Sequence, residues 1–207
     1  MLTLATIIGL LHAAPTGCPA KTLKTVSHQQ SGPTCMVAAA CTAISARHTP
    51  PAQRDLARNL PIYPDGVHAY DLVVELERRG WRGLVFTGPP EAAARLVEAG
   101  FAVLAMVKDR RGRHAVTVTG RKRVAAHKGC STALKALQLS DSRTGKTRWV
   151  SAQAFKASQS SQQLMVFYRP NERQRLGAAG FPVAVAQKID RRFRAQTLLR
   201  RAKKHRK

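Results

Sequence analysis

Cys35 and His114 are the residues whose types and positions best fit chemistry. Cys35 begins an Ala-rich stretch after the break Ser31-Gly-Pro. At the first turn of a helix, backbone N–H groups and the helix dipole favour an anion, which lowers the pKa of a thiol. A cysteine nucleophile also needs a base, and the base needs an orienting group. Among seven histidines, His114 begins a predicted strand, and the acid Asp141 ends another. These residue types predict covalent catalysis by a thiolate.

The strands that carry His114 and Asp141 can bring the two side chains together if they pair antiparallel. Aligning the strand ends places Gly120 opposite Lys135 and His114 opposite Asp141, with residues 121–133 as the connecting loop. Facing residues in such a pair lie about 4.5–5.5 Å apart, so a carboxylate there can orient an imidazole. This register predicts a Cys–His–Asp arrangement from the residues alone.

An amide for an oxyanion hole is available before the cysteine. Gln29 lies six residues before Cys35, across the Ser-Gly-Pro break. A loop of that length can fold the amide back beside the thiol, where it would act together with the Cys35 backbone N–H. Gln30 is the alternative for this role, and the sequence leaves both open.

Three other histidines are competing candidates for the base. We interpret His48 as structural, because it follows a predicted helix whose C-terminal end favours a cation. His68 precedes another helix and is expected at the surface or as a cap, and His28 adjoins Gln29 and is a candidate to line the cleft.

The helices and strands that must position these residues are predicted from hydrophobic periodicity and from the residues that start and stop helices. Thr34 is expected to cap the helix that carries Cys35. Helices come first and strands later, which predicts an α+β domain with an antiparallel sheet. Helices are expected over 34–47, 52–60, 69–79 and 90–99, and strands over 101–107, 114–119, 134–141, 148–150 and 164–168.

Composition excludes several other classes of protein. The chain has 207 residues, 44% of them hydrophobic, and its 35 Lys and Arg against 11 Asp and Glu give a net charge of +24. These values indicate one globular domain rather than global disorder. No apolar run reaches the roughly 18–20 residues that span a bilayer, so no transmembrane domain is expected. Four cysteines are too few for a disulfide-dense miniprotein.

The order Gln, Cys, His, Asp resembles papain-like cysteine peptidases. The segment 29–40 is similar to their nucleophile motif, above all that of the bacterial bacteriocin-processing (double-glycine leader) peptidase family. Arg113-His114-Ala-Val-Thr-Val is similar to that family's His strand, and Leu139-Ser-Asp141 to its Asp strand and turn. The resemblance covers residues 25–170. It implies a papain-like fold whose N-terminal helical part packs its nucleophile helix on a C-terminal antiparallel sheet.

The resemblance also implies a mechanism and a substrate class. His114 would deprotonate Cys35, the thiolate would attack a peptide carbonyl, Gln29 would stabilise the oxyanion, and water would resolve the thioester. The substrate would be a peptide or protein, and no cofactor is implied. Thr34 and Met36 stand where that family has Asp and Gly beside its cysteine, and no transporter domain follows, so a stand-alone unit is expected.

Two alternatives to a peptidase remain open. One is a catalytically inactive papain-like module that binds a peptide or an anionic partner. The other is a basic nucleic-acid-binding protein in which the Cys–His resemblance is accidental. A metal site is not expected, because His127 and Cys130 have no second ligand pair placed to join them.

The two ends of the chain carry separate expectations. Residues 1–14 are apolar and end in small residues, which predicts a signal peptide cleaved near Ala13 or Ala14. An exported chain could pair Cys130 with Cys18 or Cys41, whereas a cytoplasmic chain would keep all four thiols reduced. Residues 171–207 are expected as a basic extension, helical or disordered. Its last part, from Arg191 to Lys207, has nine Lys and Arg and no acid, which favours an anionic partner such as nucleic acid, lipid or a cell-wall polymer.

Overall fold

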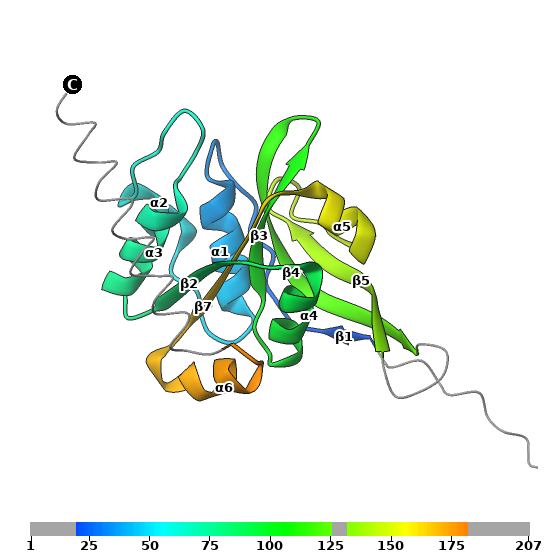
Figure 1. The fold of residues 1–207 in the computed structure, drawn as a ribbon. Helices are drawn as coiled ribbons and strands as arrows, with labels where there is room; N and C mark the ends of the chain where they lie inside the picture. The colour runs from blue at the N-terminus through cyan, green and yellow to red at the C-terminus, as the bar shows by residue number, and fades with distance from the viewer. Residues whose placement is uncertain (1–19, 126–131, 182–207) are drawn as a thin grey trace, which may run out of the picture.

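A seven-stranded antiparallel sheet forms the centre of the fold, with helices on both of its faces (Figure 1). The computed structural model describes residues 20–125 and 132–181. The strand order is β2-β7-β3-β4-β5-β6, and β1 pairs with β4. The strands are β1 (Lys21–Thr22), β2 (Arg82–Thr87), β3 (Val103–Asp109), β4 (Gly112–Ala125), β5 (Thr132–Asp141), β6 (Thr147–Ser151) and β7 (Gln159–Tyr168).

The helices divide the hydrophobic core into two clusters, one on each face of the sheet. The helices are α1 (Cys35–Ser45), α2 (Gln53–Arg58), α3 (Ala69–Arg78), α4 (Pro90–Glu98), α5 (Ala152–Ser158) and α6 (Arg173–Ala178), with a 3-10 turn η1 (Pro170–Glu172) before α6. Helices α1 to α3 share one cluster with Leu104 and Met165 of the central strands. Helices α4 and α5 share the other with their neighbours Val103 and Leu164, because successive side chains of a strand point to opposite faces.

Helix α1 is buried along almost its whole length because its side chains are small. Every residue from Met36 to Ile44 is buried, and alanines allow the helix to approach the sheet closely. The hydroxyl of Thr117 on β4 donates to the Ala39 carbonyl at 2.9 Å, which fixes α1 against β4. Thr34 occupies the N-cap position, but the expected side-chain cap is absent: its hydroxyl donates to the Ser31 carbonyl at 2.7 Å instead.

The predicted α+β class and the packing of the cysteine helix on an antiparallel sheet are both confirmed. The sequence prediction missed β2, which lies between α3 and α4. Its four central residues are buried, with Val85 in one core cluster and Leu84 in the other, so the strand lacks the polar and apolar alternation that marks a half-exposed strand. The expected loop 121–133 was wrong in extent, because β4 continues to Ala125 and β5 begins at Thr132.

Residues 170–181 pack onto the same core. Leu176 of α6 is buried, and Phe181 packs against Phe86 of β2 with ring centroids 5.0 Å apart. The predicted signal segment 1–14 and the basic segment from Arg191 to Lys207 lie outside the described residues. Within the described part, no helix is long and apolar enough to cross a membrane.

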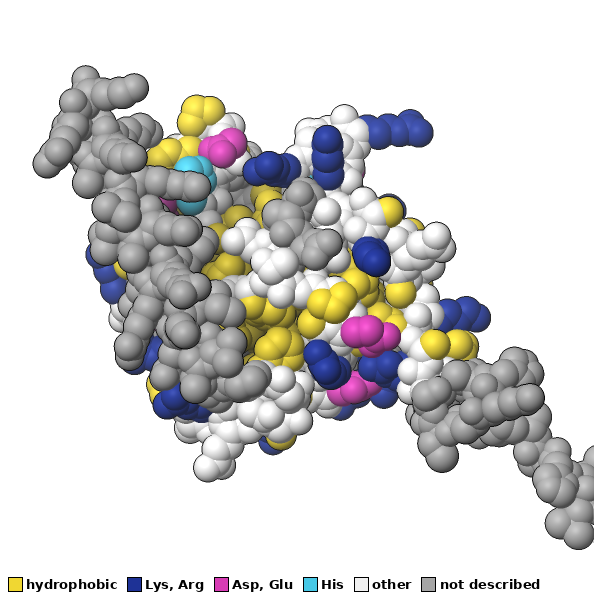
Figure 2. All heavy atoms as spheres, in the orientation of Figure 1, with side chains coloured by type: hydrophobic (Ala, Val, Ile, Leu, Met, Phe, Trp, Pro, Cys, Tyr) yellow, Lys and Arg dark blue, Asp and Glu magenta, His cyan; other side chains and the backbone are white. Residues whose placement is uncertain are grey.

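Lys and Arg side chains are spread over the face of the molecule in Figure 2, and the acidic side chains on that face lie beside them. One such group joins α4 to β4: Arg121 and Arg123 both contact the carboxylate of Glu98, and Arg123 also reaches Glu91. In this strongly basic chain, ion pairs of this kind hold acidic side chains in place against neighbouring strands.

Candidate active site

Cys35 is the first residue of α1 and is half-buried at the end of the helix. Cys41 lies two turns further along the same helix, fully buried, and is the other free thiol among the described residues. Burial raises the pKa of Cys41 to about 12, which disfavours the thiolate form of this cysteine. The helix therefore presents one accessible sulfur and encloses the other. Cys18 and Cys130 lie outside the described residues.

His114 and Asp141 are in direct contact, with 2.7 Å between Nε2 and Oδ1. The predicted register was wrong. At Asp141 it was off by two residues, because Asp141 faces Val116 on β4, and at Gly120 it was off by three, because Gly120 faces Gln138 rather than Lys135. A shift of two residues preserves the side of the sheet on which a side chain lies. The imidazole of His114 consequently reaches Asp141 from a diagonal position.

The ring of His114 also contacts the thiol of Cys35. Burial alone would raise the pKa of Cys35, but the hydrogen bond and charge of His114, with the backbone N–H groups of Ala115 and Met36, outweigh it and lower the pKa. With Nε2 held by Asp141, Nδ1 is the ring nitrogen that remains for the sulfur. The two groups can therefore exchange a proton.

The pKa of His114 moves in the opposite direction. The ring is 2% exposed, and this burial would lower its pKa, but its contacts with Cys35 and Asp141 raise it above the usual value. A thiol pKa that falls beside an imidazole pKa that rises favours the thiolate–imidazolium pair.

Asp141 is held as a carboxylate by its own turn. Burial would raise its pKa, but the hydrogen bond to His114 and the backbone N–H of Arg143, which donates to Oδ1 at 2.8 Å, lower it. The turn closes with the backbone N–H of Gly145 donating to the Asp141 carbonyl at 2.8 Å, and Gly145 has a φ of 68°, which suits glycine. The role of the Arg143 backbone was not visible from the sequence.

Gln29 and Gln30 differ in their exposure and in their hydrogen-bond partners. Gln29 is exposed, and its side-chain nitrogen donates to the Arg143 carbonyl at 3.1 Å. Gln30 is half-buried: its side-chain nitrogen donates to the Gly32 carbonyl at 3.0 Å, and its Oε1 is buried without a partner among the described residues. Both amides are thus adjacent to the loop that leads into Cys35, one on the Asp141 side and one within the loop itself.

The competing histidines have other partners. His48 lies 2.9 Å from Glu172, and His68 lies 3.1 Å from Asp65. The ring of His28 meets the side chain of Gln53, while burial, the larger effect, lowers its pKa. Among the described residues, the histidine that interacts with Cys35 is His114.

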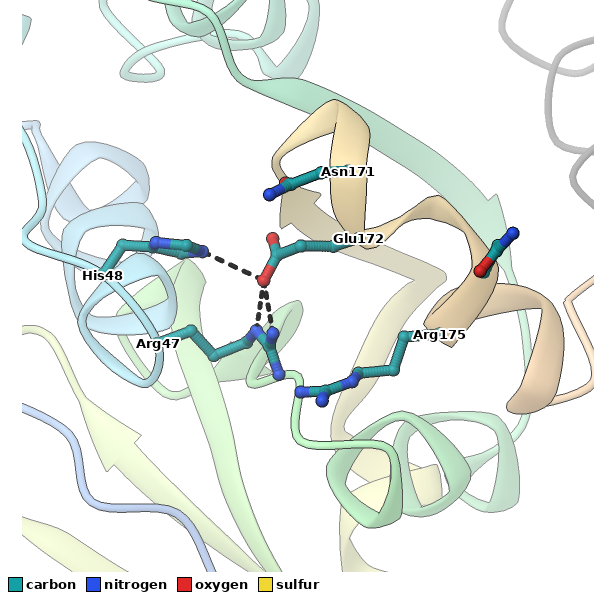
Figure 3. A pocket seen from close by; sticks show the side chains of 6 residues that line it. Arg47, His48, Asn171, Glu172 and Arg175 are labelled. Carbon is teal, nitrogen blue, oxygen red and sulfur yellow. Dashed lines mark hydrogen bonds and ion pairs between the residues drawn. The ribbon is translucent and has the colours of Figure 1, made fainter.

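A cleft of about 510 Å³ lies beyond the opposite end of α1 from Cys35. Figure 3 shows Arg47 and His48 converging on Glu172, with Asn171 and Arg175 beside them. Arg47 Nε donates to Glu172 Oε1 at 2.6 Å. Eleven residues of helix separate the two ends, a length of about 16 Å, so this cleft is a site apart from the thiol.

Two segments flank the Cys35 end of α1. The 61–68 loop lies against Pro33, two residues before Cys35, because a Cβ added at Gly66 would lie 3.2 Å from the Pro33 carbonyl oxygen. Within this loop Tyr63 stacks on His68 with centroids 4.1 Å apart. The second segment is the β3–β4 hairpin, seen in bright green at the top of Figure 1, which carries His114.

Residues 20–125 and 132–181 contain no group of three or more His, Cys, Asp or Glu placed to hold a metal ion. His127 and Cys130 lie outside these ranges.

Comparison with solved structures identifies the fold. The peptidase domain of Streptococcus ComA, a bi-functional ABC transporter involved in a quorum sensing pathway, matches with a TM-score of 0.55 and 12% identity, over 70% of this chain and 98% of that domain. A double glycine motif protease from an AMS/PCAT transporter, solved in complex with its leader peptide, matches with a TM-score of 0.51 and 15% identity, over 71% and 93%. No protein-family model and no curated protein sequence matches this chain.

The chain has the fold of double-glycine peptidase domains. This confirms the papain-like resemblance predicted from the segment around Cys35 and the strands of His114 and Asp141, at the level of the fold. At 12–15% identity the similarity concerns architecture, and what the site does must be argued from its own geometry.

Proposed function

We propose that this protein is a cysteine peptidase that hydrolyses peptide bonds with Cys35 as nucleophile, His114 as base and Asp141 as the residue that positions His114. The observation that carries the proposal is that one imidazole contacts both the thiol and the carboxylate. A structural cysteine has no need of such partners, as the buried Cys41 demonstrates. The fold neighbours, which are peptidase domains, support the same class.

The reaction begins with transfer of the Cys35 proton to His114. The thiolate then attacks the carbonyl carbon of the substrate, and the negative charge that develops on the oxygen is stabilised by the Cys35 backbone N–H and a glutamine amide. His114 next gives its proton to the nitrogen of the leaving amine, the C–N bond breaks, and a thioester to Cys35 remains. Water, deprotonated by His114, attacks the thioester, releasing the carboxylate product and returning the proton to the sulfur.

Each positioning contact has a distinct task in this scheme. Asp141 holds the ring by Nε2, which leaves Nδ1 directed at the sulfur, and its negative charge stabilises the imidazolium that forms. The Arg143 backbone N–H in turn holds the carboxylate. The glutamine that completes the oxyanion hole is Gln29 in the proposed mechanism, with Gln30 as the competing residue.

The proposal is tested by measuring the rate of Cys35 alkylation by iodoacetamide against pH, with Cys41 as the internal control read by mass spectrometry. We expect Cys35 to react well below pH 8, because His114 stabilises its thiolate, and Cys41 to remain unmodified in the folded protein. The Asp141→Asn variant should shift the Cys35 profile to higher pH, because the imidazolium loses its counter-charge.

Activity is measured in parallel with a mixture of internally quenched peptides. Cys35→Ser should remove hydrolysis while leaving the thermal unfolding transition in place. Hydrolysis that persists in Cys35→Ser would exclude the proposed nucleophile. A Cys35 that alkylates only near the pKa of a free thiol, together with no hydrolysis, would instead indicate an inactive module that binds peptides.

A further inference from the structure

The tip of the β3–β4 hairpin carries a concentration of positive charge beside the proposed catalytic site. We define the basic rim as the four exposed side chains Lys108, Arg110, Arg111 and Arg113, which lie within six residues before His114 at the tip of the hairpin. In Figure 2 dark blue side chains project from the part of the molecule where this hairpin lies in Figure 1.

The rim is not neutralised by the acids around it. Asp109, the carboxylate of the same tip, is occupied by Arg143 at 2.6 Å and by the backbone N–H of Arg111 at 2.7 Å. Asp141 is engaged with His114, and Asp65 with His68. Within the described parts of the chain, no ion pair involves the four side chains of the basic rim. They are therefore available to an anionic ligand.

The strand register places two of these side chains over the cysteine end of α1. Ala115 packs in the same core cluster as α1, and its backbone N–H contacts the sulfur of Cys35. Arg113 is two residues nearer the tip, so its side chain leaves β4 on that same face, about 7 Å further along. Lys108 is paired with Arg113 across the hairpin and shares the face. The side chains of Arg113 and Lys108 therefore extend, beyond Cys35, the face of the sheet on which α1 packs.

The charge of Arg113 acts on the 61–68 loop, the other segment that flanks the Cys35 end of α1. The pKa of Asp65 in the 61–68 loop is lowered chiefly by its hydrogen bond with His68, and the charge of Arg113 adds to this effect. The 61–68 loop also lies against Pro33, two residues before Cys35. Arg113 therefore lies near both segments that flank the Cys35 end of α1, and Lys108 is its partner across the hairpin.

We propose that the basic rim, through Lys108 and Arg113, binds an aspartate or glutamate side chain of the peptide substrate close to the cleaved bond. This inference rests on the proposed peptidase function. Guanidinium and ammonium groups that are not already in an ion pair can bind carboxylates by charge-assisted hydrogen bonds. A peptide is favoured over nucleic acid because the rim contains no aromatic side chain on which a base could stack and because it adjoins the sulfur that a peptide must approach.

The test uses binding rather than cleavage, so that it is independent of turnover. The full chain with Cys35→Ala is titrated with a fluorescein-labelled peptide of alternating Glu and Ala, and with its Gln counterpart, by fluorescence anisotropy. The test variant adds Lys108→Glu and Arg113→Glu. The matched control adds Lys135→Glu and Arg173→Glu, two exposed cations on β5 and α6, and makes the same change in net charge.

We expect the Glu peptide to bind more tightly than the Gln peptide, and the rim variant to weaken Glu-peptide binding about tenfold while the control changes it less than about twofold. Equal losses in the rim variant and the control, or no loss in the rim variant, would overturn the proposal. Tighter, rim-dependent binding of a DNA strand of equal length or of phosphatidylglycerol vesicles would also overturn it, because the rim would then recognise phosphate. Rim-dependent peptide binding in a chain that shows no hydrolysis would refute the peptidase function and leave the rim as a peptide-binding surface.

Discussion

His114 is the residue on which the proposed chemistry depends, because its ring contacts two groups that are far apart in the sequence. Cys35 comes from the start of a helix and Asp141 from the end of a strand. Each contact changes a pKa in the direction that favours charge separation: Cys35 down, His114 up and Asp141 down. In all three groups the hydrogen bonds and charges of the neighbouring groups outweigh burial, which alone would shift each pKa the other way.

The two glutamines give a prediction at the scale of one side chain. If Gln29 supplies the oxyanion hole, Gln29→Ala should lower kcat on an internally quenched peptide about 100-fold, with Gln30→Ala changing it little. The Gln29 amide must then leave the Arg143 carbonyl when substrate binds. Steady-state kinetics of the two variants decide between them, and the reverse pattern would assign the role to Gln30.

At this scale the sequence allowed the choice of cysteine, base and acid, because residue type and order along the chain carry that information. It did not allow a choice between Gln29 and Gln30. Neighbouring residues of a loop have no periodicity that fixes where their side chains point, and here one amide is exposed while the other is half-buried. Backbone groups such as the N–H of Arg143 have no signature in the sequence at all.

At the scale of elements, β2 and α3 pack closely at Gly83, where the contact leaves no room for a larger side chain. A Cβ at Gly83 would lie 2.8 and 3.0 Å from the two methyl carbons of Val73. Valine is branched at Cβ and cannot move its methyl groups away by a small rotation. We expect Gly83→Ala to lower the free energy of unfolding by about 1–3 kcal/mol, measured by urea denaturation.

A double-mutant cycle identifies the cause of that loss. Combined with Val73→Ala, the substitution at Gly83 should cost about 1 kcal/mol less than it does alone. Simple additivity of the two changes would show that the loss at Gly83 arises from the backbone rather than from contact with α3.

The pairing of β4 with β5 shows what can be predicted about strands from the sequence, and what cannot. The strands themselves were predicted from their apolar alternation, but their register at Asp141 was wrong by two residues. Alternation has a period of two, so it defines the face of each residue and is unchanged by a shift of two. The irregularity in pairing between Val118 and Gly120 alters the alignment further, and a bulge of this kind is set by local packing rather than by the hydrophobic pattern.

At the scale of the whole molecule, Glu172 joins the last described segment to the end of α1. The side chain is 7% exposed and contacts Arg47 and His48. Burial would raise its pKa, but the Arg169 backbone N–H and these two side chains lower it. The ion pairs therefore contribute stability above the unfolded pKa of about 4.3, and this contribution is lost as the pH falls through the lower folded value.

We expect Glu172→Gln to lower the free energy of unfolding by about 2 kcal/mol at pH 7, and the difference from the wild type to shrink as the pH is lowered below about 4. Urea denaturation across this range measures both effects. Glu91→Gln is the control, because Glu91 is 47% exposed beside Arg123 and should change stability by less than about 0.5 kcal/mol. A pH-independent loss at Glu172 would show that its shape rather than its charge matters.

Three consecutive residues of β4 lie in different surroundings. Arg113 belongs to the exposed basic rim, His114 contacts Cys35 and Asp141, and Ala115 packs in the core. If the basic rim selects substrates as proposed, substitutions at the few positions before His114 can change which peptides bind without altering the contacts of His114 or the core. The hairpin tip would then be the part of the fold where substrate preference can be changed by design while the contacts among Cys35, His114 and Asp141 stay the same.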